Sequence, residues 1–209
     1  MNGTKRATSR NAQKNVLMAG VGGQGVLAAS ETLALAALAE GFEAKQSEVH
    51  GVAQHGGSVV SHVRFGSRVF SPLIRCGEVD LLCAAEQLEA LRYAHYVKPD
   101  GRLVLSDYTI QPIQFPGTPE TPYPEGIPEF LRGKGYEVLV LPAMPTAVEL
   151  GDKRCANVVL LGALAACLDL GDASWRAALE RGFPAKILDL NLRAFDAGRD
   201  LAACDTRAG

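Results

Sequence analysis

The sequence predicts an α/β fold with a doubly wound, mainly parallel sheet and a helical C-terminal part. Short apolar runs typical of buried strands alternate with stretches of helical pattern along much of the chain. The last strand pattern, "YEVLVLPA", is followed only by buried and amphipathic helical patterns. Strands that alternate with helices favour parallel pairing through right-handed crossovers, which winds helices onto both faces of the sheet.

The size and charge of the chain fit one domain of this kind. Its 209 residues are 47% hydrophobic and 21% charged, with a formal net charge of −2. This charge gives no basic field for nucleic acid or an anionic membrane, and no apolar run reaches the ~20 residues that span a bilayer. We expect residues 15–209 to form a single domain. Residues 1–14, basic and without an apolar core, are expected to be a disordered tail, with a partner-binding arm as the alternative.

The first half of the chain supplies most of the expected strands. An apolar run, "KNVLMAG", leads into the turn "GVGGQG", and the pattern from Gln24 to Glu40 predicts a buried, alanine-rich helix that Gly41 ends. "FEAKQ" and "SVVSHVRF" are expected to be strands, the second with one more polar face. After them, "VDLLCAA", "EQLEALRYAHYV" and "GRLVLSD" predict a strand, a helix and a strand.

A proline-rich segment precedes the last strand. Six of the 11 prolines lie between Pro112 and Pro128, which predicts a long extended loop, either a surface connection or a partner contact. Beyond the strand "YEVLVLPA", a buried helix is expected in "ANVVLLGALAACLDL". "DASWRAALERG" predicts a helix that ends at Gly182, and "AKILDLNLRAFDAGRDLA" an amphipathic one.

The cysteines show no spacing for a metal ion or a cluster. The chain has five, far apart and without a C-x-x-C pair: Cys76, Cys83, Cys155, Cys167 and Cys204. No metal site is therefore expected. An odd number of scattered cysteines favours a reducing, cytoplasmic setting.

The turn "GVGGQG" raises the question of a bound phosphate. It satisfies G-x-G-x-x-G between a strand and a helix, where a dinucleotide fingerprint belongs, and a helix start favours an anion. The acidic residue expected about 20 positions later is not cleanly placed, and Glu48 is a late candidate. A free-standing dinucleotide-binding protein or NAD-dependent oxidoreductase is therefore one hypothesis, and a tight turn without a ligand is another.

A second glycine-rich stretch, "QSEVHGVAQHGGSVVSHVRFG", gathers polar side chains that can face a ligand or a partner. The spacing of its histidines matches no common metal site, and the chain has no G-x-S-x-G elbow for a serine nucleophile. A surface turn with solvated histidines is the alternative. The polar residues concerned are Gln46, Ser47, Glu48, His50, Gln54 and His55.

Together the two stretches resemble the gamma-type domain of the 2-oxoacid:ferredoxin oxidoreductases, and in particular the small subunit of the indolepyruvate-type members. A third stretch, "GDKRCANVVLLGAL" at residues 151–164, resembles the start of that family's C-terminal helix. The resemblance covers about residues 15–168. It implies oxidative decarboxylation of a 2-oxoacid, such as indolepyruvate, another arylpyruvate or phenylglyoxylate, on thiamine diphosphate. The acyl group passes to coenzyme A and electrons pass through [4Fe-4S] clusters to ferredoxin.

The resemblance also implies a division of labour between subunits. The "GDK" at Gly151 and the "GDA" at Gly171 lack the context of the family's GDG thiamine motif, and the cysteines are too scattered for clusters. A large partner subunit is therefore expected to hold thiamine diphosphate, Mg²⁺ and the clusters, in a dimer of heterodimers. This chain is expected to bind no cofactor alone.

In this hypothesis both glycine-rich stretches face the partner's cofactor site, and a pure scaffold subunit is the alternative. The candidate residues there are Gly22, Gly23, Gln24, Gly25, His50, Gln54 and Gly56. His55 is the candidate catalytic residue, because a protonated imidazole would attract anionic substrates or steady a developing negative charge. The family loop more often has Met and Arg where this chain has Val52 and His55, so a permanent cation is lacking there.

Overall fold

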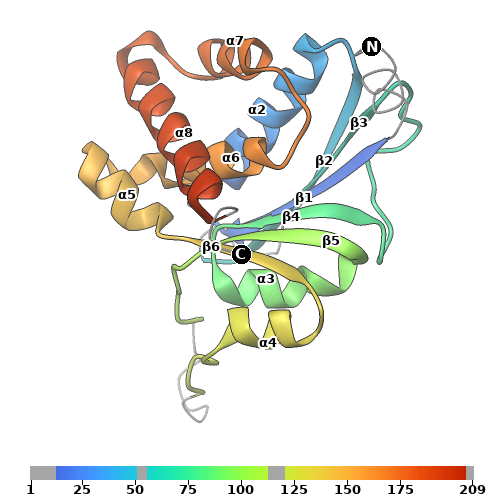
Figure 1. The fold of residues 1–209 in the computed structure, drawn as a ribbon, viewed down its shortest axis with the longest axis vertical. Coiled ribbons are helices and arrows are strands. Elements are labelled where there is room, and N and C mark those ends of the chain that lie inside the picture. The colour runs from blue at the N-terminus through green and yellow to red at the C-terminus, as the bar shows by residue number, and fades with distance from the viewer. Residues whose placement is uncertain (1–12, 51–55, 113–120, 206–209) are drawn as a thin grey trace.

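The computed structural model describes residues 13–50, 56–112 and 121–205, and within them the chain forms a six-stranded sheet covered by helices on both faces (Figure 1). The strand order is β2-β3-β1-β4-β5-β6. The strands are β1 (Lys14–Val21), β2 (Glu43–His50), β3 (Ser58–Gly66), β4 (Val79–Ala84), β5 (Val97–Ser106) and β6 (Glu137–Leu141). The predicted α/β class and doubly wound arrangement are confirmed.

The sheet is parallel except around β3. β1, β4, β5 and β6 pair in parallel, whereas β3 lies antiparallel between β1 and β2. Residues 51–57 between β2 and β3 are too few for a parallel crossover, which needs about a dozen residues or more. β2 is also longer than the predicted "FEAKQ": it continues through the polar residues up to His50, because an edge strand tolerates polar side chains.

The register of these strands brings the two glycine-rich stretches to one edge of the sheet. Ser58 at the start of β3 pairs with Val21 at the end of β1, and His50 at the end of β2 pairs with Val59. The parallel strands β4, β5 and β6 end at this same edge. Ligands of open α/β sheets bind outside the carboxyl ends of the strands.

The larger layer of helices covers one face and holds the main core (Figure 1). The central helix of this layer, α6 (Ala156–Ala166), is nearly all buried, as its apolar sequence predicts. The turn before α6 carries Lys153 and Arg154. The layer comprises α2 (Val26–Ala39), α5 (Ala143–Leu150), the 3₁₀ turn η2 (Lys153–Cys155), α6 (Ala156–Ala166), α7 (Asp172–Gly182) and α8 (Ala185–Asp205). α2 begins two residues later than predicted, because Gly25 adopts a left-handed φ of 74° as its N-cap.

The opposite face carries α3 (Gln87–Tyr93), the 3₁₀ turn η1 (Ala94–Tyr96) and α4 (Ile127–Gly133) over a second, smaller core. The prediction of an extended loop up to Pro128 is wrong at its end. Pro128 lies in the first turn of α4, where a missing N–H costs nothing and the fixed φ suits a helix. None of the described helices combines the length and the apolar character needed to cross a membrane.

Candidate functional site

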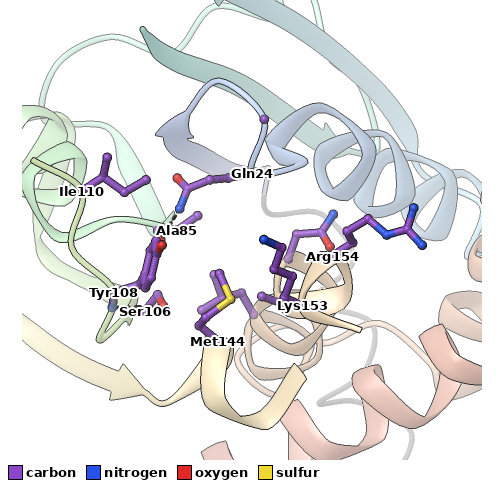
Figure 2. Close-up of a pocket in the computed structure, with 12 residues that line it drawn as sticks. Gln24, Ala85, Ser106, Tyr108, Ile110, Met144, Lys153 and Arg154 are labelled. Atoms are coloured by element: carbon purple, nitrogen blue, oxygen red, sulfur yellow. Dashed lines mark hydrogen bonds between the residues drawn. The ribbon is translucent and has the colours of Figure 1, made fainter. Parts of the chain in front are cut away.

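A pocket of about 230 Å³ opens where the carboxyl ends of the parallel strands meet (Figure 2). Figure 2 shows Ser106 and Tyr108 on one side of this space and Lys153 on the other. The pocket is lined from five parts of the chain: the β1–α2 turn (Gly23, Gln24), the residue after β4 (Ala85), the end of β5 and the residues after it (Ser106, Tyr108, Ile110), α5 (Met144), and η2 with α6 (Lys153, Arg154, Ala156, Asn157, Leu160).

The glycines of the β1–α2 turn serve different purposes. A Cβ on Gly25 would lie 2.4 Å from the side-chain nitrogen of Asn157, so Gly25 gives room to α6 of the same chain. Gly22 donates its backbone N–H to the carbonyl of Gly57 over 2.9 Å, which joins the two glycine-rich stretches directly. Gly23 also has a left-handed φ of 100°, but nothing lies within 4 Å of the place where its Cβ would be. Of the glycines in this turn, Gly23 is the one shown to border open space.

Both polar atoms of the Gln24 side chain form hydrogen bonds within this edge of the sheet. Its side-chain oxygen accepts from the backbone N–H of Val21 over 2.7 Å, and its side-chain nitrogen donates to the carbonyl of Ala85 over 3.0 Å (Figure 2). The amide therefore ties the turn after β1 to the end of β4. It shapes the pocket while its own polar atoms are already paired.

Two basic residues stand beside the pocket, and they differ in their partners. The guanidinium of Arg154 contacts the Asp152 carboxylate, with nitrogen–oxygen distances down to 2.6 Å, and this contact lowers the pKa of Asp152. The ammonium of Lys153 has no ion pair with any residue of the described ranges, and in Figure 2 it reaches toward the turn that carries Gln24. Lys153 is therefore the cation that an anionic ligand in the pocket would meet.

Asn157 lines the same pocket, and its side-chain oxygen lacks a partner. Its nitrogen donates to the carbonyl of Gly25 over 3.1 Å, which fixes the orientation of the amide. The oxygen is buried and accepts no hydrogen bond from the described part of the chain. The role of Asn157 at this site is therefore the contact between α6 and the β1–α2 turn, and its buried oxygen is an exception to the rule that buried acceptors are paired.

The predicted site residues fall into three groups. Gly22, Gly23, Gln24 and Gly25 lie in the turn, with Gly23 and Gln24 at the pocket. Gly56, with φ 75°, is exposed next to Gly57, and the backbone of His50 pairs with Val59 at the same edge. Gln54 and His55 lie outside the described residues.

Lys153, Asn157 and Tyr108 were not predicted as site residues. The signal for the first two was in the sequence: a basic pair and an asparagine directly precede or begin an apolar helix in "GDKRCANVV". Such residues stand at a helix start, where an anion is favoured. Tyr108 could not be found in this way, because only the strand order brings the end of β5 beside α6.

The described residues do not fit a thiamine–metal site or an iron–sulfur cluster. Asp152 is occupied by Arg154, and Asp172 by Arg176 and Arg199, so neither "GD" aspartate is free for Mg²⁺. Cys83 in β4 and Cys155 in η2 are buried, Cys76 and Cys204 are exposed, and Cys167, directly after α6, is half-buried. No group of three or more His, Cys, Asp or Glu in the described ranges could hold a metal ion.

The chain matches known proteins over nearly its whole length. Residues 15–201 match the family described as pyruvate ferredoxin/flavodoxin oxidoreductase. The chain is 35% identical over 188 residues to the indolepyruvate oxidoreductase subunit IorB of Pyrococcus horikoshii, an alignment that covers 88% of this chain and 93% of the relative.

Two solved structures are similar in fold. The gamma subunit of a keto/oxoacid ferredoxin oxidoreductase from Geobacter sulfurreducens superposes with a TM-score of 0.72 and 24% identity, over 92% of this chain and 98% of the other. A 2-oxoglutarate:ferredoxin oxidoreductase from Magnetococcus marinus, with 2-oxoglutarate, coenzyme A and succinyl-CoA bound, gives 0.71 and 26% identity. That match covers 92% of this chain and 31% of the larger one.

The fold, the pocket at the strand ends and the match over residues 15–201 together define the class. The chain belongs to the pyruvate ferredoxin/flavodoxin oxidoreductase family. These findings confirm the family predicted from the two glycine-rich stretches, and with it the prediction of a small subunit of a 2-oxoacid:ferredoxin oxidoreductase.

Proposed function

We propose that this chain is the small, cofactor-free subunit of an indolepyruvate-type 2-oxoacid:ferredoxin oxidoreductase, and that its pocket binds part of coenzyme A at the junction with a large partner. The enzyme would convert a 2-oxoacid and coenzyme A to acyl-CoA and CO₂, and two electrons would pass to ferredoxin. Thiamine diphosphate, Mg²⁺ and [4Fe-4S] clusters would reside on the partner. The absence of a thiamine motif and of grouped cysteines in this chain supports that division.

The single observation that carries the proposal is the incomplete pocket at the carboxyl edge. Three sequence motifs of the family meet there, through the Gly22–Gly57 and Gly25–Asn157 hydrogen bonds. Yet the described walls hold no group that could bind a metal ion, and their charged side chains are the two cations Lys153 and Arg154. A pocket that is assembled so specifically, and lacks the means for the chemistry, fits a wall that a partner completes.

The chemistry of the walls suits coenzyme A in particular. Its phosphates would pair with the ammonium of Lys153, which lines the pocket. Leu160, Met144 and Ile110 give apolar surface for the methylene segments. In this role the chain binds and orients the acyl acceptor and shields the junction from water. His55, which lies outside the described residues, stays a proposal as an additional, pH-dependent cation.

The choice of 2-oxoacid would rest with the partner. The pocket walls named above contact the acyl acceptor in this proposal, and the 2-oxoacid would bind beside the partner's thiamine diphosphate. The relatives support this assignment, because one is named for indolepyruvate and a structural neighbour for 2-oxoglutarate. We favour indolepyruvate or a similar arylpyruvate for this chain, with ferredoxin as the electron acceptor and a dimer of heterodimers as the assembly.

The test is co-expression with the partner. The isolated chain should be colourless and inactive toward indolepyruvate, whereas the co-expressed complex should be brown and should reduce ferredoxin only when coenzyme A is present. Stoichiometric iron in the isolated chain would contradict the proposal. Calorimetric titration of the isolated chain with NAD and ATP separates the rival hypothesis, because a free-standing dinucleotide-binding protein would bind one of them without a partner.

A further inference from the structure

The buried carboxylate of Glu86, the residue that caps α3, is hydrogen-bonded to one wall of the pocket. Glu86 is 1% exposed. One of its oxygens accepts from the backbone N–H of Ile110 over 3.1 Å and from the hydroxyl of Tyr123 over 2.5 Å. The other accepts from the backbone N–H of Glu89 over 2.9 Å, which caps α3. Within the described ranges no lysine or arginine pairs with this carboxylate, so hydrogen bonds alone offset its burial.

The contacts of Glu86 reach the pocket through the segment after β5. Ile110 and Tyr108 line the pocket, and both are hydrogen-bonded to residues at the start of α3. The backbone N–H of Gln87 donates to the carbonyl of Tyr108 over 3.2 Å, and its side chain donates to the carbonyl of Asp107 over 3.1 Å. Hydrogen bonds from Gln87 to Asp107 and Tyr108 therefore hold residues 107–110 against the start of α3. The hydrogen bond between Ile110 and the Glu86 carboxylate completes this set.

Tyr123 extends this attachment to the other end of the proline-rich segment. Its hydroxyl donates to Glu86 and accepts from the backbone N–H of Leu88 over 2.9 Å. Burial and the neighbouring Glu86 carboxylate raise the pKa of Tyr123, so the hydroxyl keeps its proton and stays a donor. The side chain of Gln111 also joins residues near the two ends of this segment, because it donates to the carbonyl of Thr121 over 2.8 Å.

Capping a helix does not require glutamate. Ser, Thr, Asp and Asn are the preferred N-caps, because their short side chains reach the first turn. The extra methylene of Glu86 lets one carboxylate cap α3 and also reach Ile110 and Tyr123. The chain thus has at this position a residue that is unusual for a cap and suited to joining three segments.

We propose that Glu86 is a positioning residue, which sets the Tyr108–Ile110 wall of the pocket at the place where coenzyme A binds. The ligand rests on the proposed function, whereas the fixing of the wall does not. Glu86 touches neither substrate nor cofactor in this role. It acts through Ile110 and Tyr108, and its removal should loosen the acceptor's binding site more than the fold.

Two variants separate this role from helix capping. Glu86→Asp keeps a strong cap, but its side chain is one methylene too short to reach Ile110 and Tyr123. If Glu86 only caps α3, this variant should match the wild type in both measurements below. Tyr123→Phe keeps the Glu86 cap on the Glu89 N–H, removes the hydroxyl from Glu86 and from the Leu88 N–H, and serves if Glu86→Asp fails to fold. Glu129→Gln is the control, because Glu129 lies in α4 and its side chain is 72% exposed.

The first measurement is hydrogen exchange on the full chain. In Glu86→Asp and in Tyr123→Phe, amides of residues 106–112 should exchange about tenfold faster than in the wild type, as the loss of a hydrogen bond to a buried charge allows. Peptides from α6 and α8 should be unchanged, as should every peptide in Glu129→Gln. Unchanged exchange at 106–112 would overturn the proposal, and so would an equal increase in all peptides, which indicates general destabilisation.

The second measurement uses the co-expressed complex. Both variants should raise the KM for coenzyme A about tenfold while kcat stays near the wild-type value, since the wall binds the acceptor without reacting. An active complex with an unchanged KM would overturn the role in acceptor binding. An inactive wild-type complex would instead contradict the proposed function, and the exchange measurement would still decide whether Glu86 fixes the wall.

Discussion

Asn157 donates a hydrogen bond from its side chain to the carbonyl oxygen of Gly25, and the two residues lie 132 positions apart in the sequence. The contact joins the first glycine-rich turn to the start of α6. It also explains why position 25 is a glycine, because a Cβ there would lie 2.4 Å from the donating nitrogen, at a left-handed φ. The first glycine-rich stretch and the stretch at residues 151–164, which both carry the family resemblance, are thus in direct contact.

Gly25→Ala should therefore lower the free energy of unfolding by more than the backbone strain alone would. The strain of a left-handed residue costs about 1–2 kcal/mol, and the contact with Asn157 adds to it. Gly41→Ala is the matched control, because Gly41 has φ 90° and nothing within 4 Å of its Cβ position. Urea unfolding measures both. In an Asn157→Ala background the excess cost of Gly25→Ala should shrink, and an excess that persists would show that the contact is not its cause.

Gly23→Ala tests the approach of the partner. Gly23 and Gly41 share a left-handed φ and open surroundings, so the two alanine variants should lose similar stability. Only Gly23 borders the pocket, so only its variant should weaken assembly with the large subunit. Size-exclusion chromatography of the co-expressed complexes makes the comparison. Equal retention of partner by both variants would favour an ordinary turn.

Two glycines allow α6 and α8 to cross closely, and neither should tolerate alanine. A Cβ on Gly162 would lie 2.0 Å from the carbonyl oxygen of Phe195, and one on Gly198 would lie 1.9 Å from that of Val159. Because both obstacles are backbone atoms, the helices must move apart, and each variant should lose about 3 kcal/mol of unfolding free energy. Gly133→Ala, at the open end of α4, should stay within about 1 kcal/mol of the wild type. Comparable melting temperatures for all three variants would argue against close packing.

His62 should make the chain sensitive to acid. It is 5% exposed, burial lowers its pKa, and its Nδ1 accepts the backbone N–H of Ile74 over 3.2 Å. The unfolded chain then binds a proton more readily than the folded one, so stability falls as pH drops below about 6.5, by up to ~1.4 kcal/mol per pH unit. His62→Asn keeps an acceptor without the titration. The wild type should lose more stability than this variant between pH 7.5 and 5.5, and parallel losses would contradict the assignment.

Lys153→Gln should weaken binding of coenzyme A in the assembled enzyme. Losing an exposed cation beside a phosphate should raise KM about fivefold, and the effect should fade as salt screens the charge. Arg154→Gln should do less, because that guanidinium is already paired with Asp152. Lys134→Gln, on the opposite face of the sheet, is the control. Steady-state kinetics at two ionic strengths decide, and a salt-independent loss in Lys153→Gln would argue against a phosphate contact.

Local patterns in the sequence determined the fold class, the buried helices and the family. Apolar runs with strand spacing and the alanine-rich stretches around α2 and α6 depend only on neighbouring residues, so their burial could be predicted. The turn "GVGGQG" could likewise be placed between a strand and a helix. The family followed from the spacing of whole motifs rather than from any single residue.

Tertiary structure alone decided how these motifs meet. The antiparallel insertion of β3 depends on pairing between distant strands, and it sets Val21 beside Ser58. The roles of Gly25 and Glu86 depend on partners far away in the sequence, Asn157 and Tyr123, whose distances no local pattern encodes. The turn "GVGGQG" contacts α6 at Gly25 and leaves Gly23 beside the pocket, because the side chain that lies against Gly25 belongs to Asn157, far away in the sequence.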